Sequence, residues 1–243
     1  MKAIGLEVAP AAGLEALARQ GMQDARPVEI IGVDMLRRAV LTGLLEAGQL
    51  LRQDELATNF GVSRMPVRVA LRQLESEGLV RHLPRRGFVV ATLTPQEIDE
   101  IYEIRALLEG HAMRLAVPQL AEDRLRRLER LLAAGKQQKD PLHLLEAREK
   151  FYRELYEAAG RTRLVRLIMQ LRAEVAPYLL AQQMPASTES HAELLAICRR
   201  RDGHAAEEFM RTHLRRVAAM LRDLVTEDRK PKGGGGRTRP STK

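Results

Sequence analysis

The sequence predicts a mainly α-helical protein: a small helical domain with one β-hairpin, followed by an all-helical antiparallel bundle. Two observations predict the small domain. An arginine-rich helix with end signals follows a tight turn, and two short apolar runs come after that helix. The bundle is predicted because residues 94–227 show only helical periodicity between short breaks. An aromatic content of 3% and abundant Leu, Ala, Arg and Glu agree with this fold class.

The chain is expected to divide into four segments. These are a flexible N-terminal extension over 1–26, a first domain over 27–93, a helical domain over 94–227 and a disordered basic tail over 228–243. Residues 1–26 lack the complete pattern of a secretory signal. Six of the eight net positive charges lie in the last fifteen residues, so the sequence pI near 10.0 does not by itself indicate DNA binding.

Composition also restricts the class of protein. With 45% hydrophobic residues, a chain of 243 residues can bury the cores of two domains. Cys198 is the only cysteine, so an internal disulfide framework is excluded. No run reaches the roughly 20 apolar residues that a membrane-spanning helix needs. We therefore expect a cytoplasmic protein with no membrane association.

Three helices are expected in the first domain, and two of them precede the arginine-rich helix. Residues 53–59 indicate a short helix, and residues 60–62 form the tight turn of a helix-turn-helix. The earliest helix is predicted by an apolar stripe at Val33, Leu36, Ala39, Val40 and Leu44.

The third helix is expected to run from Arg64 to Glu77. Ser63 is suited to cap its N-terminus, Pro66 falls in its first turn, where backbone N–H groups have no intrahelical partner, and Gly78 gives a stop signal. These signals together fix both ends of the helix from the sequence alone.

One face of this third helix is cationic. Arg64, Arg68 and Arg72 recur every four residues. No Asp or Glu occurs between Glu55 and Glu75, so we expect no nearby acid to neutralise these arginines. Such a face suits phosphates and guanine edges, although solvated surface charge is the ordinary alternative. A second face is apolar and is formed by Val67, Ala70, Leu71 and Leu74.

A hairpin is expected directly after the third helix. Its strands span 79–83 and 88–91, and residues 84–87 join them. Arg85 and Arg86 at the tip would form a basic wing, which favours DNA binding over solvated charge. The candidate DNA-contacting residues are Arg52, Ser63, Arg64, Met65, Pro66, Arg68, Arg72, Arg85, Arg86 and Gly87.

This pattern resembles the winged helix-turn-helix of the GntR family of bacterial transcription regulators. Val69 departs from the family, which commonly has Glu there, and residues 47–50 depart from a frequent Pro-Gly-Glu/Asp-Arg. The resemblance implies a homodimer that reads a pseudo-palindromic DNA operator. It covers roughly residues 33–93 and depends on Glu55-Leu56-Ala57, Phe60 to Arg64, Pro66 to Arg68, Ala70-Leu71, Leu74 and Gly78 to Val80.

The second domain is expected to begin with a capping box at residues 94–97. Later breaks at 117–118, 135–140, 160, 184–185 and 202–203 indicate about six helices. We expect five inward polar side chains to surround one cavity that binds a small anion. They are Arg105, Arg148, Tyr152, His191 and His213.

A plainer alternative exists for each of these five side chains. An inward histidine is commonly satisfied within a core, and an inward arginine commonly pairs with a local acid. The candidate acids are Glu109, Glu149 and Glu174.

The helical segments resemble the FCD class of GntR regulators over roughly residues 94–224. Many members of that class hold a divalent metal with one Asp and three His, and Arg148 and Tyr152 stand at two of those four positions. The other two match His191 and His213, which leaves an incomplete metal site. Because Arg148 would repel a cation, we expect no required cofactor, and we hypothesise that Arg148 and Arg105 bind an effector carboxylate directly. The matching segments are 104–109, 151–155, 158–160, 191–197 and 210–214.

We therefore expect a DNA-binding transcription regulator, acting as a repressor, whose operator affinity responds to a small organic acid. One alternative is an architectural DNA-binding dimer that responds to no effector. Another is a metal-assisted enzyme that uses His191 and His213. The sequence contains neither an HExxH motif nor a glycine loop followed by Lys-Ser/Thr, so we do not expect an enzyme.

Overall fold

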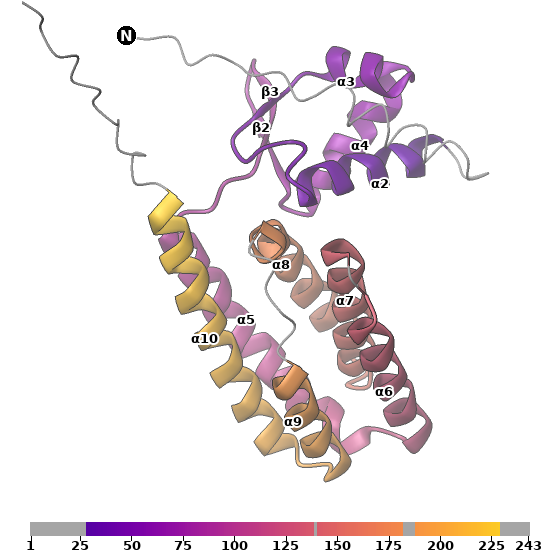
Figure 1. Ribbon diagram of the computed structural model, residues 1–243, viewed down its shortest axis with the longest axis vertical. Coiled ribbons are helices and arrows are strands. Elements are labelled where there is room, and N and C mark those ends of the chain that lie inside the picture. Colours follow the sequence, from indigo (N-terminus) through magenta and orange to yellow (C-terminus); the bar gives the residue numbers. More distant parts are fainter. Residues whose placement is uncertain (1–27, 139, 182–187, 229–243) are drawn as a thin grey trace, which may run out of the picture.

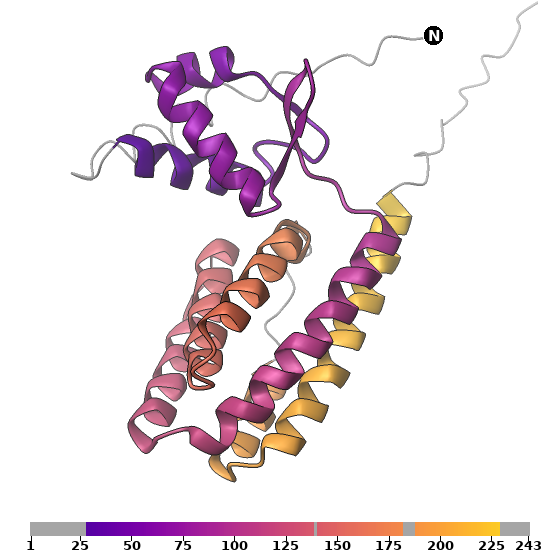
Figure 2. The same cartoon turned by 180° about the vertical axis from the view of Figure 1, so that it is seen from behind.

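The computed structural model describes residues 28–138, 140–181 and 188–228. Figures 1 and 2 show the small domain, from α2 to β3, lying over one end of a longer helical domain. A single segment leads from β3 into α5. The expected N-terminal extension lies outside the described residues, and so does the expected basic tail from residue 229 onward.

The small domain combines helices with a short antiparallel sheet. Its helices are α2 (Val28–Leu41), α3 (Gln53–Phe60) and α4 (Arg64–Ser76), and its strands are β1 (Leu50–Leu51), β2 (Val80–Leu83) and β3 (Gly87–Val90). The sheet order is β1-β3-β2, and β2 and β3 form the expected hairpin. Strand β1 is not predicted from the sequence, because two residues are too few to show an alternating pattern.

The ends of α3 and α4 are set mainly by glycine. Gly61 ends α3 in a left-handed conformation, and Gly78 adopts φ 75° after α4. The N–H of Leu79 then donates to the carbonyl of Leu74 at 3.0 Å. Ser63 has the extended backbone of an N-cap, but its exposed side chain makes no capping hydrogen bond, so the predicted Ser63 cap is wrong as a side-chain interaction.

The helical domain begins at the predicted capping box. The Thr94 hydroxyl accepts a hydrogen bond from the Glu97 N–H at 3.1 Å, and the Glu97 carboxylate accepts one from the Thr94 N–H at 2.7 Å. The elements that follow are α5 (Pro95–Ala116), the 3₁₀ helix η1 (Val117–Gln119), α6 (Glu122–Lys136), α7 (Pro141–Glu157), α8 (Thr162–Ala181), α9 (Thr188–Arg199) and α10 (Gly203–Asp228).

The expected six α-helices are therefore found in the described part of this domain; the predicted break at 184–185 lies outside it. Helices α5 and α10 lie side by side in both views, and α6, α7 and α8 form the adjoining group. None of the described helices has the length and apolar content needed to span a membrane.

Helix α8 makes contacts between the helical domain and the small domain. The Tyr178 hydroxyl accepts a hydrogen bond from the N–H of Leu93, in the connecting segment, at 2.5 Å. Glu174 lies against Gly78 so closely that a Cβ on that glycine would come within 2.2 Å of the Glu174 Cγ. A crevice of about 1530 Å³ separates α2 and the end of α4 from α7 and α8. The turn that follows α4 is thus in direct contact with α8, at the edge of this crevice.

Candidate DNA-binding face and candidate effector site

The outward face of α4 is solvent-exposed and cationic, as the sequence predicts. Arg64 is 73% exposed and Arg72 is 58% exposed at the side chain, and Arg68 is exposed as well. The opposite face is buried in the core through Val67, Ala70, Leu71 and Leu74. Packing therefore leaves the arginines available to a phosphate backbone or to base edges.

The expectation that no acid neutralises these arginines is wrong for two of them. Arg64 Nε lies 2.5 Å from Asp54 Oδ1, because the turn after α3 brings the start of that helix alongside α4. Arg72 Nη1 lies 2.7 Å from Glu75, one turn further along. Arg68 instead donates to the Met65 sulfur at 2.9 Å and makes no ion pair within the described residues. Exposed pairs of this kind contribute about 0–1 kcal/mol, so a phosphate can displace them.

The wing holds two exposed arginines in a tight turn. The N–H of Arg86 donates to the carbonyl of Leu83 at 3.0 Å, and Arg85 adopts φ 64°, a left-handed conformation that side chains rarely take. The Arg72 guanidinium lies 5.4 Å from the centre of the Phe88 ring on β3, so the wing and α4 contact each other.

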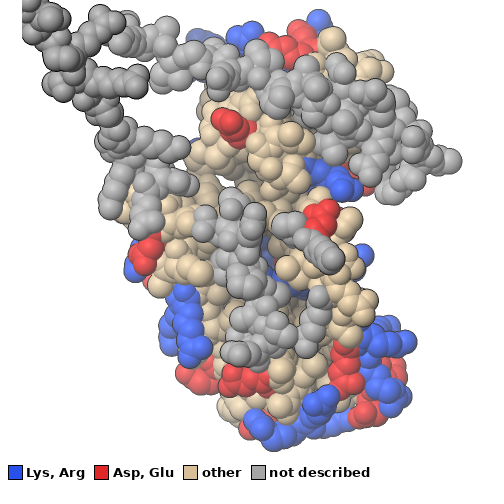
Figure 3. Space-filling view, viewed as in Figure 1, with Lys and Arg blue, Asp and Glu red and all other residues tan. Residues whose placement is uncertain are grey.

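The remaining DNA-contact candidates differ in exposure. Arg52, Ser63, Met65 and Arg86 are exposed, whereas Pro66 and Gly87 are partly buried. In Figure 3, charged side chains of both signs gather at the end of the helical domain away from the small domain.

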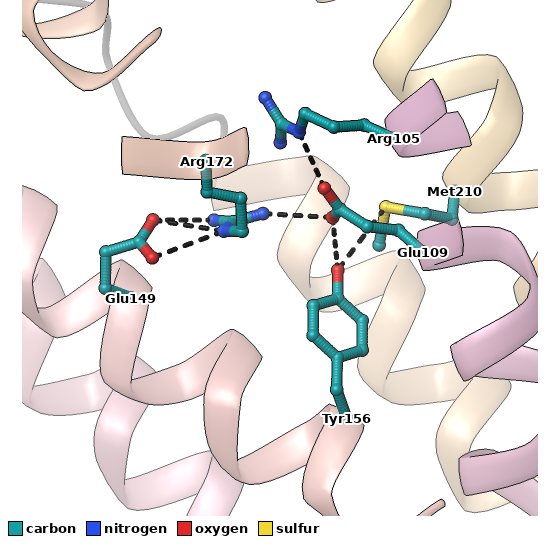
Figure 4. Close-up of polar contacts among 6 residues, drawn as sticks. All are labelled: Arg105, Glu109, Glu149, Tyr156, Arg172 and Met210. Atoms are coloured by element: carbon teal, nitrogen blue, oxygen red, sulfur yellow. Dashed lines mark hydrogen bonds and ion pairs between the residues drawn. The ribbon is translucent and has the colours of Figure 1, made fainter. Parts of the chain in front are cut away.

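A buried ionic cluster lies inside the helical domain. It consists of Arg105, Glu109, Glu149, Tyr156 and Arg172, and Figure 4 shows three of these side chains converging on the Glu109 carboxylate. Arg105 Nε donates to it at 2.7 Å, Arg172 Nη1 donates at 3.0 Å, and the Tyr156 hydroxyl also donates. Arg172 continues to Glu149, with its Nη2 3.0 Å from Oε1.

The charge states of the buried ionic cluster follow from these contacts. Burial raises the pKa of Glu109, but the guanidinium groups of Arg105 and Arg172 outweigh burial and lower the pKa overall, so this carboxylate is ionised. Burial and the neighbouring Glu109 hold the pKa of Tyr156 well above its ordinary value, so the phenol keeps its proton.

Four of the five predicted effector residues line one small cavity beside the cluster. Arg105, Arg148, Tyr152 and His213 are in its lining, and His191 is not. His191 instead packs against aromatic rings, 5.6 Å from Phe151 and 5.8 Å from Tyr152 between centroids. The cavity measures about 10 Å³, which is room for about one water molecule. The predicted constellation is thus largely assembled, but an organic acid requires the site to open.

The residues around this cavity carry more positive than negative charge. The guanidinium groups of Arg105, Arg148 and Arg172 face only two carboxylates, Glu109 and Glu149. Arg148 Nε and Arg105 Nη1 are both buried without a hydrogen-bond partner. His213 adds no charge at neutral pH, because burial and the nearby Arg148 lower its pKa to about 4. A surplus cation with unused donors favours an added anion.

Sequence reasoning missed Arg172, which is central to the cluster. A signal for it exists on α8, where Arg172 continues a helical row of apolar residues through Val165, Ile168 and Val175. The local-acid alternative holds for Arg105, which pairs with Glu109 four residues on. Glu149 pairs with Arg172 rather than with an arginine in the predicted set.

The side chains at the family's metal positions do not fit a divalent cation. Among the described residues, no group of three or more His, Cys, Asp or Glu is arranged to hold a metal ion. Arg148 lies close enough to lower the pKa of His213 and would repel a cation in the same way.

The charge on Glu109 predicts a specific pH dependence of stability. Because its folded-state pKa is lowered, its contribution is fully present above the ordinary carboxyl pKa of about 4.3 and is lost as pH falls through the lowered value. The difference in unfolding free energy between wild type and Glu109→Gln should therefore be largest near pH 7 and shrink at acid pH. Denaturant titrations from pH 7 to pH 3 measure it, and a difference that stays constant would contradict this assignment.

The chain is similar to known regulators over both domains. Residues 33–90 match bacterial regulatory proteins of the gntR family, and residues 100–216 match the FCD domain. A solved structure of a transcriptional regulator (GntR family member) from Pseudomonas syringae pv. tomato str. DC3000 is 31% identical, with a TM-score of 0.51. The alignment covers 89% of this chain and 97% of that chain.

Several curated relatives carry the name of repressor, and two of them illustrate the range of similarity. The HTH-type transcriptional repressor RspR of Escherichia coli (strain K12) is 26% identical over 211 residues, covering 80% of this chain and 89% of the relative. The gluconate operon transcriptional repressor of Bacillus subtilis (strain 168) is 49% identical over 74 residues, which is 30% of each chain. The similarity is thus highest where the match is shortest.

Proposed function

The chain belongs to the GntR family of bacterial regulatory proteins and is a DNA-binding transcription regulator with an FCD domain, and on this premise we propose that it is a repressor whose operator affinity is controlled by a small carboxylate. The repressor assignment is supported by the name of the RspR relative, whose match extends over both domains. In this proposal the regulator acts as a homodimer. Its two small domains are then related by a two-fold axis and read the two halves of a pseudo-palindromic operator.

Helix α4 and the wing are the DNA-reading parts in this proposal. Arg64 and Arg68 contact bases or phosphates from the exposed face of α4, and Arg72 contacts phosphate. Arg85 and Arg86 approach the backbone or the adjacent minor groove from the wing. The ion pairs of Arg64 and Arg72 are exposed and exchange their carboxylates for phosphates on binding.

The position and the unused hydrogen-bond donor of Arg148 support a carboxylate effector. Its Nε is buried without a hydrogen-bond partner, and it lines the same small cavity as Arg105 and His213. A carboxylate would satisfy the unused donors of Arg148 and Arg105 and would balance the surplus charge. Neutral His213 and Tyr152 would orient the rest of the molecule.

Glu149 connects effector binding to the DNA-binding domain. Among the described residues, it alone lines both the internal cavity and the crevice below α2 and α4. An entering carboxylate replaces Glu149 as a partner of Arg172, which opens the small cavity and moves Glu149 into the crevice. Coupling of about 1–3 kcal/mol between effector and operator is typical of such regulators.

Titrating purified protein with its operator tests the DNA-reading part. Substituting Arg68 by alanine should weaken binding and reduce the slope of log affinity against log salt by about one, because one phosphate contact is lost. Arg199→Ala, which removes an exposed cation from α9 that pairs with Glu129, is the matched control and should leave the slope unchanged. An unchanged slope in Arg68→Ala would remove Arg68 from the phosphate contacts.

A further inference from the structure

Two apolar side chains are exposed on α4 among its arginines. Met65 is 55% exposed and Val69 is 46% exposed, and their spacing of four residues makes them neighbours on the helix surface. Neither belongs to the core face of α4, which consists of Val67, Ala70, Leu71 and Leu74. The folding of the small domain therefore does not account for this apolar pair.

The apolar pair is central on the outward face of α4. At about 100° per residue, Met65, Val69 and Arg72 fall within about 30° of the direction opposite to the mean of the four core residues. By the same geometry Arg68 lies about 70° and Arg64 about 110° from that direction. If α4 enters a groove with its core face turned away, Met65 and Val69 face the base edges. Arg72 lies beside them about one turn further along the helix, and Arg64 and Arg68 lie toward the backbone on one side.

The major groove offers one kind of apolar group to such a pair, the C5-methyl of thymine. We propose that Val69 is a specificity-determining residue that contacts a thymine methyl in each operator half-site. Met65 is less suited to this contact, because its flexible side chain loses more rotamer freedom on binding than the β-branched Val69 does. Arg68 and Arg72, which lie on one flank of the pair, supply the charge complementarity that holds this face against DNA. The inference depends on the proposed entry of α4 into the groove.

Replacing thymine by deoxyuridine tests the contact, since this change removes only the methyl group. The operator is first selected from a randomised duplex pool with the full-length wild-type protein, and each thymine is then replaced in turn. In wild type, at least one replacement per half-site should weaken binding about fourfold, the effect of one buried apolar carbon. Val69→Ala should bind the thymine operator about fourfold or more weakly and should lose this sensitivity at that position.

Val69→Ala is a suitable variant because alanine has the highest helix propensity, so α4 should fold normally. Its salt slope should equal that of wild type, since no charge changes. Leu167→Ala, the same kind of truncation at an exposed position of α8, should keep the methyl sensitivity of wild type.

Equal sensitivity to methyl removal in wild type and Val69→Ala would overturn the contact, and so would a selected operator in which no thymine methyl affects binding. If wild type enriches no sequence at all, reading of DNA by α4 fails as a whole, which is a different failure from the loss of the Val69 contact alone.

Discussion

Replacing Glu109 by alanine is expected to destabilise the helical domain by about 3–5 kcal/mol, because it removes one partner of a buried ion pair. Glu109 is fully buried and accepts hydrogen bonds from Arg105, Arg172 and Tyr156. Without it, the Arg105 and Arg172 guanidinium groups stay in the core with too little negative charge around them. Chemical denaturation followed by circular dichroism measures the change in unfolding free energy.

Glu129→Ala is the matched control for this experiment. Glu129 also pairs with an arginine, Arg199, at 2.6 Å, but the Arg199 side chain is 58% exposed and that of Glu129 is 35% exposed. Its loss should change stability by about 0–1 kcal/mol. If Glu109→Ala were as mild as this control, the cluster would not be a structural centre of the domain.

Replacing Arg148 by alanine is expected to abolish the response to the effector and to leave the fold and operator binding intact. Two charge-assisted hydrogen bonds to a carboxylate contribute about 1.5–3 kcal/mol each, so effector binding should weaken at least tenfold. Arg148 Nε has no hydrogen-bond partner, so its removal should not lower the unfolding free energy. Thermal-shift measurements report the stability of the fold and the binding of each acid in a panel of small organic acids. Operator-binding measurements with the same acids report the effector response.

Arg172→Ala is the comparison that distinguishes effector binding by Arg148 from a general effect of removing a buried cation. Arg172 contacts both Glu109 and Glu149, so its loss should destabilise the domain, unlike the loss of Arg148. An Arg148→Ala protein that still responds normally to an acid would show that the carboxylate binds elsewhere.

The sequence predicts the small domain well because its signals are local. The turn before α4, the Gly78 stop and the wing residues are determined by a few neighbouring side chains. Strand β1 is not predictable from its own residues, because it is defined only by its pairing with β3, which lies far along the chain. The ion pair between Arg64 and Asp54 is not predicted for a similar reason, since it depends on how α3 and α4 pack against each other.

The candidate effector site is predictable only in part. Helical periodicity correctly turns Arg105, Arg148 and Tyr152 inward, because the period of a helix is fixed. It does not reveal which charges pair across helices, so Arg172 is missed and His191 is assigned to a cavity that it does not line. The size of that cavity also depends on side-chain packing, which no spacing in the sequence determines.

The central claim is that a carboxylate bound directly by Arg148 controls operator affinity. Operator affinity of chelator-treated wild type and Arg148→Ala, measured with and without each acid of a panel, tests it most directly. We expect at least one acid to change wild-type affinity about 5- to 150-fold without added metal, and the same acid to leave Arg148→Ala unaffected. A response that appears only when a divalent metal is restored, or that persists in Arg148→Ala, would contradict the claim.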